Sequence, residues 1–215
     1  MLEGIRPTML EHSRQCGILF IDFDGVLCHD RFWRSLPHEL RSSVDHFLFS
    51  DHFPIVVQWM RGHCASEEVN EVLAHFVGIA YKPLWQVFVH DCRTMNVSLA
   101  HMRSIQCIRR FMPVVVVAGN MDCFERFTVP SLGLRNYFDD VVNSAVCGRL
   151  KTDDDGRLFS DLCERYGIEQ SRAVLIDDAA RNRLAMENGG GQALDVKDWQ
   201  ALSDVLWEIE MGEYF

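Results

Sequence analysis

Short apolar runs that end in small or acidic residues recur along the chain. The runs are rich in Val and Ile and are apolar throughout, which is typical of strands buried on both faces of a parallel sheet. Four of them predict strands, and Val141–Ser144 is a candidate for one more. The four runs are Gly17–Ile21, Pro113–Val117, Ala173–Ile176 and Gln192–Leu194.

Amphipathic stretches with helical spacing separate these runs. Leu158–Tyr166 is followed by Gly167, which predicts a C-cap, and Asp198–Met211 begins at Asp198, which predicts an N-cap. Ala179–Asn188 is a third stretch, closed by three glycines. Strands that alternate with helices form βαβ units, so we predict an α/β fold with a doubly wound parallel sheet.

The interval between the first two predicted strands has a different pattern. Only Pro54–Val57 resembles a strand there, and it is ambiguous. Ser66, followed by two acidic residues, is typical of a helix N-cap. We predict a core made of residues 1–30 and 96–215, with a helical insertion at 31–95. The helix-like stretches are Pro37–Phe49, Phe53–Arg61, Ser66–Val77, Lys82–Met95 and, returning to the core, Ser98–Phe111.

Composition narrows the class of protein. Hydrophobic residues make up 48% of the chain and the net charge is −10, which fits a soluble globular protein and disfavours binding to nucleic acid or anionic membranes. No apolar run approaches a membrane span of about 20 residues. The eight cysteines form no CxxC pair, and Met1–Gln15 does not resemble a secretory signal. We therefore expect a reduced, cytoplasmic protein, and the sequence leaves its oligomeric state open.

Pairs of acidic residues follow two of the predicted strands. Asp22 and Asp24 follow the first, and Asp177 and Asp178 follow the strand at Ala173–Ile176. Ligands bind at the carboxyl edge of such sheets, and clustered carboxylates there suit a Mg²⁺ ion. One carboxylate can act as a nucleophile toward phosphorus, while a second, two residues on, donates and accepts protons. The pattern indicates Mg²⁺-dependent phosphoryl chemistry.

The segment Ile21–Leu27, with sequence IDFDGVL, resembles the first signature of the haloacid dehalogenase (HAD) superfamily. The resemblance implies a helical cap at the insertion. It also implies that Asp22 is the nucleophile and a metal ligand, and that Asp24 is the general acid and base, with its backbone carbonyl on the metal. Asp24 favours phosphate over halide chemistry, because the dehalogenases of the family lack this second Asp.

Two further segments carry the resemblance. Gly148–Asp153, with sequence GRLKTD, is similar to the third signature, with Thr152 in place of the usual Pro. By that similarity Lys151 neutralises charge between the nucleophile and the phosphoryl group. Ile176-Asp177-Asp178, followed by Asn182, resembles the fourth signature, which implies that Asp178 and Asp177 hold the Mg²⁺. Arg31, Arg34 and Lys82 are basic residues of the insertion that can reach a substrate, and the sequence does not choose among them.

The second signature differs from the family pattern. Its usual Ser or Thr is absent, since the strand ends in Ala118-Gly119-Asn120. Backbone N–H groups at Gly119 and Asn120, or the Asn120 amide, are the candidates for binding the phosphoryl group instead. We expect hydrolysis of a small phosphorylated metabolite through an aspartyl-phosphate at Asp22. The alternative is a catalytically impaired relative that binds a phosphorylated ligand or a protein.

Overall fold

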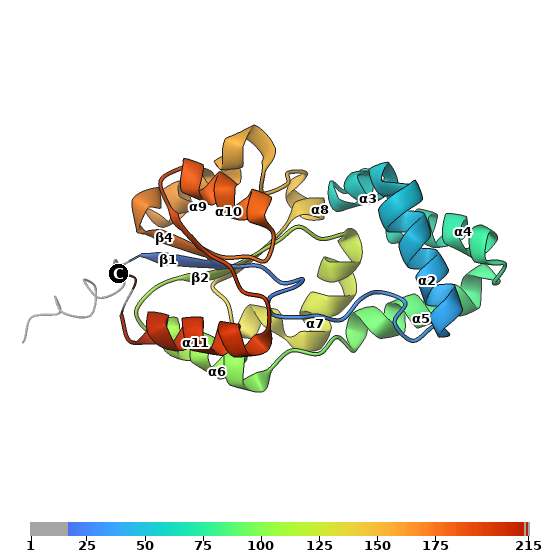
Figure 1. The fold of residues 1–215 in the computed structure, drawn as a ribbon, viewed down its shortest axis with the longest axis horizontal. Helices are drawn as coiled ribbons and strands as arrows, with labels where there is room; N and C mark the ends of the chain where they lie inside the picture. The colour runs from blue at the N-terminus through green and yellow to red at the C-terminus, as the bar shows by residue number, and fades with distance from the viewer. Residues whose placement is uncertain (1–16, 213, 215) are drawn as a thin grey trace, which may run out of the picture.

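A computed structural model describes residues 17–212 and 214, and its core is a five-stranded sheet (Figure 1). All strand pairs are parallel, and the order is β3-β2-β1-β4-β5. The predicted strands are therefore confirmed, including the extra one. Their bounds are β1 (Ile18–Ile21), β2 (Val114–Ala118), β3 (Asp140–Asn143), β4 (Ala173–Ile176) and β5 (Gln192–Leu194).

Alternate residues of the central strands face opposite helical layers, as the pleat requires. Leu19 and Ile21 pack with α6 (Leu99–Ile108) and α11 (Trp199–Glu210) on one face. Ile18 and Phe20 pack with α9 (Arg157–Tyr166) and α10 (Ala180–Asn188) on the other face (Figure 1). Because both faces are covered, the strands are apolar throughout. The predicted doubly wound α/β fold is confirmed.

Two helices of the core have the caps that the sequence predicts. Gly167 ends α9 in the left-handed region with φ 68°, and the Asp198 carboxylate at the start of α11 accepts a hydrogen bond from the Ala201 N–H at 2.9 Å, so both predicted caps are confirmed. Short helical turns complete the core. The turns are η3 (Phe124–Thr128), α7 (Val129–Leu132), η4 (Leu134–Asn136), α8 (Ser144–Cys147), η5 (Asp153–Gly156) and η6 (Gln170–Arg172).

The helices between β1 and α6 form a second body beside the carboxyl edge of the sheet (Figure 1). We call it the helical module, made of α2 (His38–His46), η2 (Phe47–Asp51), α3 (Phe53–Met60), α4 (Ser66–Val77) and α5 (Tyr81–Arg93). Its apolar residues belong to a hydrophobic cluster that is separate from the two clusters on the faces of the sheet and that includes Trp33, Leu73 and Phe88. The ambiguous segment Pro54–Val57 is helical and belongs to α3.

The module is joined to the core by polar contacts at Asp122, just beyond β2. The Asp122 carboxylate accepts hydrogen bonds from Trp59 Nε1 at 2.7 Å and from the Ser66 hydroxyl at 2.5 Å. Burial alone would raise the pKa of Asp122, but hydrogen bonds from Ser66, Arg126 and Trp59 outweigh it and hold that pKa below its usual value. The predicted N-cap role of Ser66 is wrong, because Ala65 is the N-cap and the Ser66 hydroxyl is used by Asp122.

A second junction lies between α3 and the segment that carries Lys151. Arg61 forms two hydrogen bonds of 2.7 Å with the Asp153 carboxylate. Gly62, with φ 71°, lies against the backbone of Ala145, and a Cβ atom there would meet the Ala145 carbonyl oxygen at 2.2 Å. Both contacts keep the module close to the carboxyl edge of the sheet.

Three expectations from the sequence concern the N-terminal segment, the cysteines and membrane-spanning helices. The segment Met1–Gln15 and Cys16 lie outside the described residues, so the expected lack of a signal stays a prediction. The other seven cysteines are free thiols. In the described part of the chain, no helix combines the length and the apolar character that a membrane span requires.

Candidate active site

Asp22 is the first residue after β1, in the middle of the sheet. Its backbone N–H donates to the Ile176 carbonyl at 2.9 Å, which extends the pairing of β1 with β4 by one residue. One carboxylate oxygen, Oδ1, accepts the Phe23 N–H at 2.7 Å, and the other faces Lys151. Only 6% of Asp22 is exposed. A nearly buried carboxylate is thus fixed at the carboxyl edge of the sheet.

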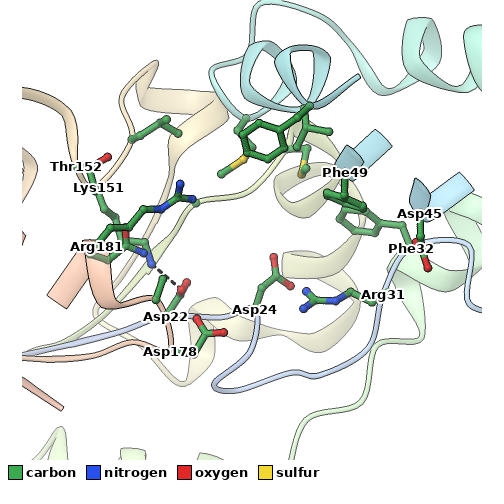
Figure 2. A pocket seen from close by; sticks show the side chains of 18 of the residues that line it. Asp22, Asp24, Arg31, Phe32, Asp45, Phe49, Lys151, Thr152, Asp178 and Arg181 are labelled. Atoms are coloured by element: carbon green, nitrogen blue, oxygen red, sulfur yellow. Dashed lines mark ion pairs between the residues drawn. The ribbon is translucent and has the colours of Figure 1, made fainter. Parts of the chain in front are cut away.

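Lys151 lies between two carboxylates. Its ammonium nitrogen is 2.7 Å from Asp22 Oδ2 and 2.5 Å from Asp177 Oδ2 (Figure 2 draws the first pair). Burial opposes the charge on Lys151, but Asp22 and Asp177 outweigh it and raise the pKa of the ammonium group. The sequence prediction that Lys151 stands beside the paired acids agrees with this placement.

Asp177 is surrounded by donors. Its carboxylate accepts hydrogen bonds from the Ala179 N–H at 2.9 Å and from the Asn182 amide at 3.0 and 3.1 Å, besides Lys151. This residue is fully buried. With both oxygens engaged, Asp177 is suited to orient Lys151, and Asn182 orients Asp177 in turn.

Asp178 is exposed and lies over the turn that follows Asp22. A Cβ atom at Gly25 would lie 2.2 Å from Asp178 Oδ2, and Gly25 has φ 82°. Only glycine combines this backbone conformation with this approach. Gly25 therefore permits the acids that follow β1 and β4 to come together, and Asp178 lies beside Asp22 (Figure 2).

Asp24 lies next to this group and is held by Asn120. The Asn120 amide nitrogen donates to Asp24 Oδ2 at 2.8 Å, while its oxygen accepts the Met121 N–H at 2.8 Å. Burial raises the pKa of Asp24 to about 6, although the positive charges of Arg31 and Lys151 oppose the shift. Asn120 is fully buried and its amide donates to Asp24, so it positions that acid. It does not line the cavity that lies between the core and the helical module.

Ala118 and Gly119, where the family pattern has a hydroxyl, face different surroundings. Ala118 is buried in the apolar layer with α6 and α11, whereas Gly119 lines the cavity. A Cβ atom at Gly119 would lie 3.2 Å from Met60 Cε and 3.8 Å from Lys151 Cε. The space for a side chain beside the candidate phosphoryl position is therefore at residue 119.

The carboxylates fit a divalent cation. Asp22, Asp177 and Asp178 each offer an oxygen, and the three oxygens lie within 4.8 Å of one another. Lys151 supplies one positive charge against these three acids. Burial raises the pKa of Asp22 to about 8, and the Asp177 charge adds to the shift against the opposing effect of Lys151. A cluster of hard oxygen donors with excess negative charge is what Mg²⁺ prefers in proteins.

A cavity of about 270 Å³ opens above these residues, between the core and the helical module. Of the three basic candidates in the insertion, Arg31 lines it, whereas Arg34 donates to the Asp91 and Thr94 carbonyls and Lys82 is not part of the lining. The cavity is small, close to the lower end of the roughly 300–1,000 Å³ typical of small-molecule sites.

The sequence interpretation missed Arg183. Its guanidinium donates to the carbonyls of Asp177 and Asp178 at 2.9 and 2.8 Å and pairs with Asp195 at 3.1 Å. Arg183 therefore fixes the backbone that presents both acids. A signal existed, because a basic residue in the first turn of a helix opposes the helix dipole and needs a reason.

Comparisons with known proteins agree with this geometry. A family model described as haloacid dehalogenase-like hydrolase matches residues 17–190. No curated protein sequence matches the chain significantly.

Several solved structures share the fold at low sequence identity. A HAD family enzyme from Bacteroides thetaiotaomicron, crystallised with magnesium and inorganic phosphate, is 16% identical with a TM-score of 0.63, covering 86% of this chain and 98% of that one. A predicted HAD-like hydrolase from Porphyromonas gingivalis is 17% identical with a TM-score of 0.66, covering 89% and 98%. A 2-haloacid dehalogenase from Pseudomonas syringae is 16% identical with a TM-score of 0.63, covering 93% and 100%.

Proposed function

We propose that this chain, which belongs to the haloacid dehalogenase-like hydrolase family, hydrolyses small-molecule phosphate monoesters with the help of Mg²⁺. The observation that carries the proposal is the convergence of Asp22, Asp177 and Asp178 around Lys151 at one edge of the sheet. Phosphate chemistry is favoured over halide chemistry because Asp24 is present and held by Asn120.

In the first step Asp22 attacks phosphorus through a carboxylate oxygen. The bond from that oxygen to phosphorus forms as the bond from phosphorus to the leaving oxygen breaks, which gives an aspartyl-phosphate. The leaving alcohol takes a proton from Asp24. A carboxyl group with a pKa of about 6 suits this task, because general acids work best when their pKa is near the operating pH.

In the second step water hydrolyses the aspartyl-phosphate. Asp24, now ionised, accepts a proton from the water as its oxygen bonds to phosphorus, and the bond to Asp22 breaks. Lys151 stays next to Asp22 and stabilises the negative charge on the phosphoryl oxygens in both steps. Asp177 keeps the Lys151 ammonium in place.

Asp22, Asp178 and the backbone carbonyl of Asp24 would hold the Mg²⁺, with Asp177 as a further ligand or an orienting acid. The ion supplies positive charge that draws the phosphate into an otherwise acidic site. We extend to this chain the Mg²⁺ that the structural relative from Bacteroides thetaiotaomicron contains. The substrate, a small phosphorylated metabolite, and a cytoplasmic location are part of the proposal.

Phosphate release is expected to require Mg²⁺. Acetyl phosphate and a panel of phosphate esters should be hydrolysed with Mg²⁺, and excess EDTA should stop the reaction until Mg²⁺ is restored. The readout is inorganic phosphate. In parallel, Mg²⁺ should raise the melting temperature, because a ligand that binds only the folded state stabilises it. Turnover that persists in EDTA, or no turnover of any ester, contradicts the proposal.

One observation favours the second candidate function, a binding protein with little activity. Gly119 leaves the cavity without the hydroxyl that the family pattern contains. If that gap limits the rate, Gly119→Ser should raise kcat by about 10²-fold, because one hydrogen bond to the transition state is worth roughly 10²–10³ in kcat. Met60 Cε has to shift by only a few tenths of an ångström.

Ala118→Ser is the matched control for this prediction. It adds the same hydroxyl inside the apolar layer, where it cannot reach the cavity, and it should lower stability without raising kcat. An unchanged or lower kcat for Gly119→Ser would mean that other groups already perform this role. If the natural protein and Gly119→Ser both bind phosphate without turnover, the second candidate function, a binding protein, is supported.

A further inference from the structure

The cavity has a charged floor and a hydrocarbon wall. The floor is formed by residues of the core, among them Asp22, Asp178, Lys151 and Arg181. The facing wall comes from the helical module and the chain leading into it, and it consists of Phe32, Trp33, Phe49, Phe53, Val56 and Met60. A phosphate ester bound with its phosphoryl group on the floor would place its leaving group against this wall.

Two aromatic residues of the wall are strongly exposed. Phe49 is 47% exposed and Phe53 is 41% exposed, although both line the cavity. Figure 2 shows Phe49 beside the cavity, on the side of the helical module. Large apolar side chains exposed within a binding cavity mark a surface that an apolar ligand covers.

Polar side chains on this wall are mostly engaged elsewhere. Asp30 accepts the Asn96 N–H at 2.8 Å. The Arg31 guanidinium is directed toward Asp24 (Figure 2). Asp45 also lines the cavity, next to Phe32 (Figure 2). The polar groups that remain are Asp45 on this wall and Thr152 and Arg181 on the side of the core. A polyol leaving group would lose water from more hydroxyl groups than these side chains can bind, which is costly. A hydrocarbon leaving group has no such cost.

The wall is rigid at its base. Phe32 lies against Trp33 and Phe88, with ring centroids 6.1 and 5.6 Å apart. Trp33 itself has φ 56°, which is unusual for a bulky residue, and its indole N–H donates a hydrogen bond to Asn70 Oδ1 at 3.2 Å. Ring packing against Phe88 at 4.8 Å holds this conformation. The apolar surface is therefore formed before a ligand arrives.

We propose that the substrate is a phosphate monoester of an apolar alcohol about the size of a phenyl or short alkyl group, with Phe49 and Phe53 as the residues that select it. This inference rests on the proposed function, because it assigns the leaving group of that reaction. The volume of about 270 Å³ admits such a group.

The test compares phenethyl phosphate with a pentitol 1-phosphate, both of which are esters of a primary alcohol. Acetyl phosphate, whose leaving group is only an acetate, serves as the reference substrate. We expect kcat/KM for phenethyl phosphate to exceed that for the pentitol phosphate by about tenfold or more. Phe49→Ala should lower kcat/KM for phenethyl phosphate about tenfold and change that for acetyl phosphate less than about twofold.

Phe76→Ala is the matched control, because Phe76 is also 47% exposed in the helical module but lies against Phe47, away from the cavity. It should leave the rates for all three substrates unchanged. A pentitol phosphate hydrolysed as well as phenethyl phosphate would overturn the inference. So would equal effects of Phe49→Ala and Phe76→Ala on phenethyl phosphate.

A binding measurement separates this inference from the proposed function. If neither acetyl phosphate nor any phosphate ester is hydrolysed, the proposed function has failed, and calorimetry with inert phosphonates in Mg²⁺ decides the apolar site alone. Phenethylphosphonate should then bind about tenfold more tightly than methylphosphonate, and Phe49→Ala should remove that advantage. Equal affinities of the two phosphonates would overturn the inference.

Discussion

Asp22→Asn is expected to abolish phosphate release while the protein stays folded. The amide cannot act as a nucleophile toward phosphorus, and loss of a nucleophile lowers kcat by roughly 10⁴-fold or more. The change is nearly isosteric, and the amide oxygen can still accept the Phe23 N–H. Release of inorganic phosphate from acetyl phosphate, in Mg²⁺ and at saturating substrate, measures the effect.

The same substitution has a predictable effect on stability without metal. Burial raises the pKa of Asp22 from 3.8 unfolded to about 8 folded, so the folded state binds the extra proton. The free energy of unfolding of the natural protein therefore decreases as the pH rises from about 4 toward about 8. Asp22→Asn removes this dependence. In EDTA, its melting temperature relative to the natural protein should rise with pH across this range.

Asp204→Asn is the control for both measurements. Asp204 lies on the surface of α11 and accepts a hydrogen bond from Gln200, far from the site in sequence and fold. It should change neither turnover nor the pH dependence. A variant Asp22→Asn that keeps a substantial fraction of turnover, with its identity verified by mass, would contradict the role of Asp22.

The sequence predicts the central part of the site because a simple rule applies there. Parallel strands align their carboxyl ends, so acids that follow β1 and β4 must meet if those strands are neighbours, as they are in this sheet. Gly25 could also be foreseen as the turn residue. These predictions need only strand positions, which short apolar runs reveal clearly.

Contacts set by loops could not be foreseen in the same way. The bond from Asn120 to Asp24 and the contacts of Asp122 with Trp59 and Ser66 join residues whose separation depends on turn conformation. Local pattern assigned Ser66 to a helix N-cap, and a tertiary partner determined its actual contact. The selection of Gly119 over Ala118 as the residue facing the cavity likewise required the direction of each side chain at the end of β2.

Lys151→Met is expected to lower both stability and activity strongly. Lys151 is 3% exposed and stands between two carboxylates, so its removal leaves the buried charge of Asp177 without a positive partner beside Asp22. Removing one partner of a buried ion pair costs about 3–5 kcal/mol, or a fall of roughly 10 °C in melting temperature for a chain of this size. Turnover should fall about 10³-fold, because charge on the phosphoryl group is no longer neutralised.

Lys197→Met provides the matched control, since Lys197 has a side chain that is 83% exposed and pairs with Asp195 at only 3.8 Å. Surface changes of this kind alter stability by less than about 0.5 kcal/mol. Melting curves in EDTA compare the two variants without metal. If Lys151→Met loses no more stability than Lys197→Met, the buried ion pairs do not contribute as their geometry indicates.

A double variant separates the lost positive charge from the lost side chain. In Lys151→Met combined with Asp177→Asn, the buried charge that the single variant leaves without a partner is also removed, so the electrostatic cost of the single variant is reduced. The double variant should therefore lose less stability than the sum of the two single changes, with a coupling of roughly 1–3 kcal/mol. Activity should not return, because the positive charge beside Asp22 is still missing. Additive losses of stability would instead assign the cost to packing, and would place the electrostatic balance of the site elsewhere than in the contact of Lys151 with Asp177.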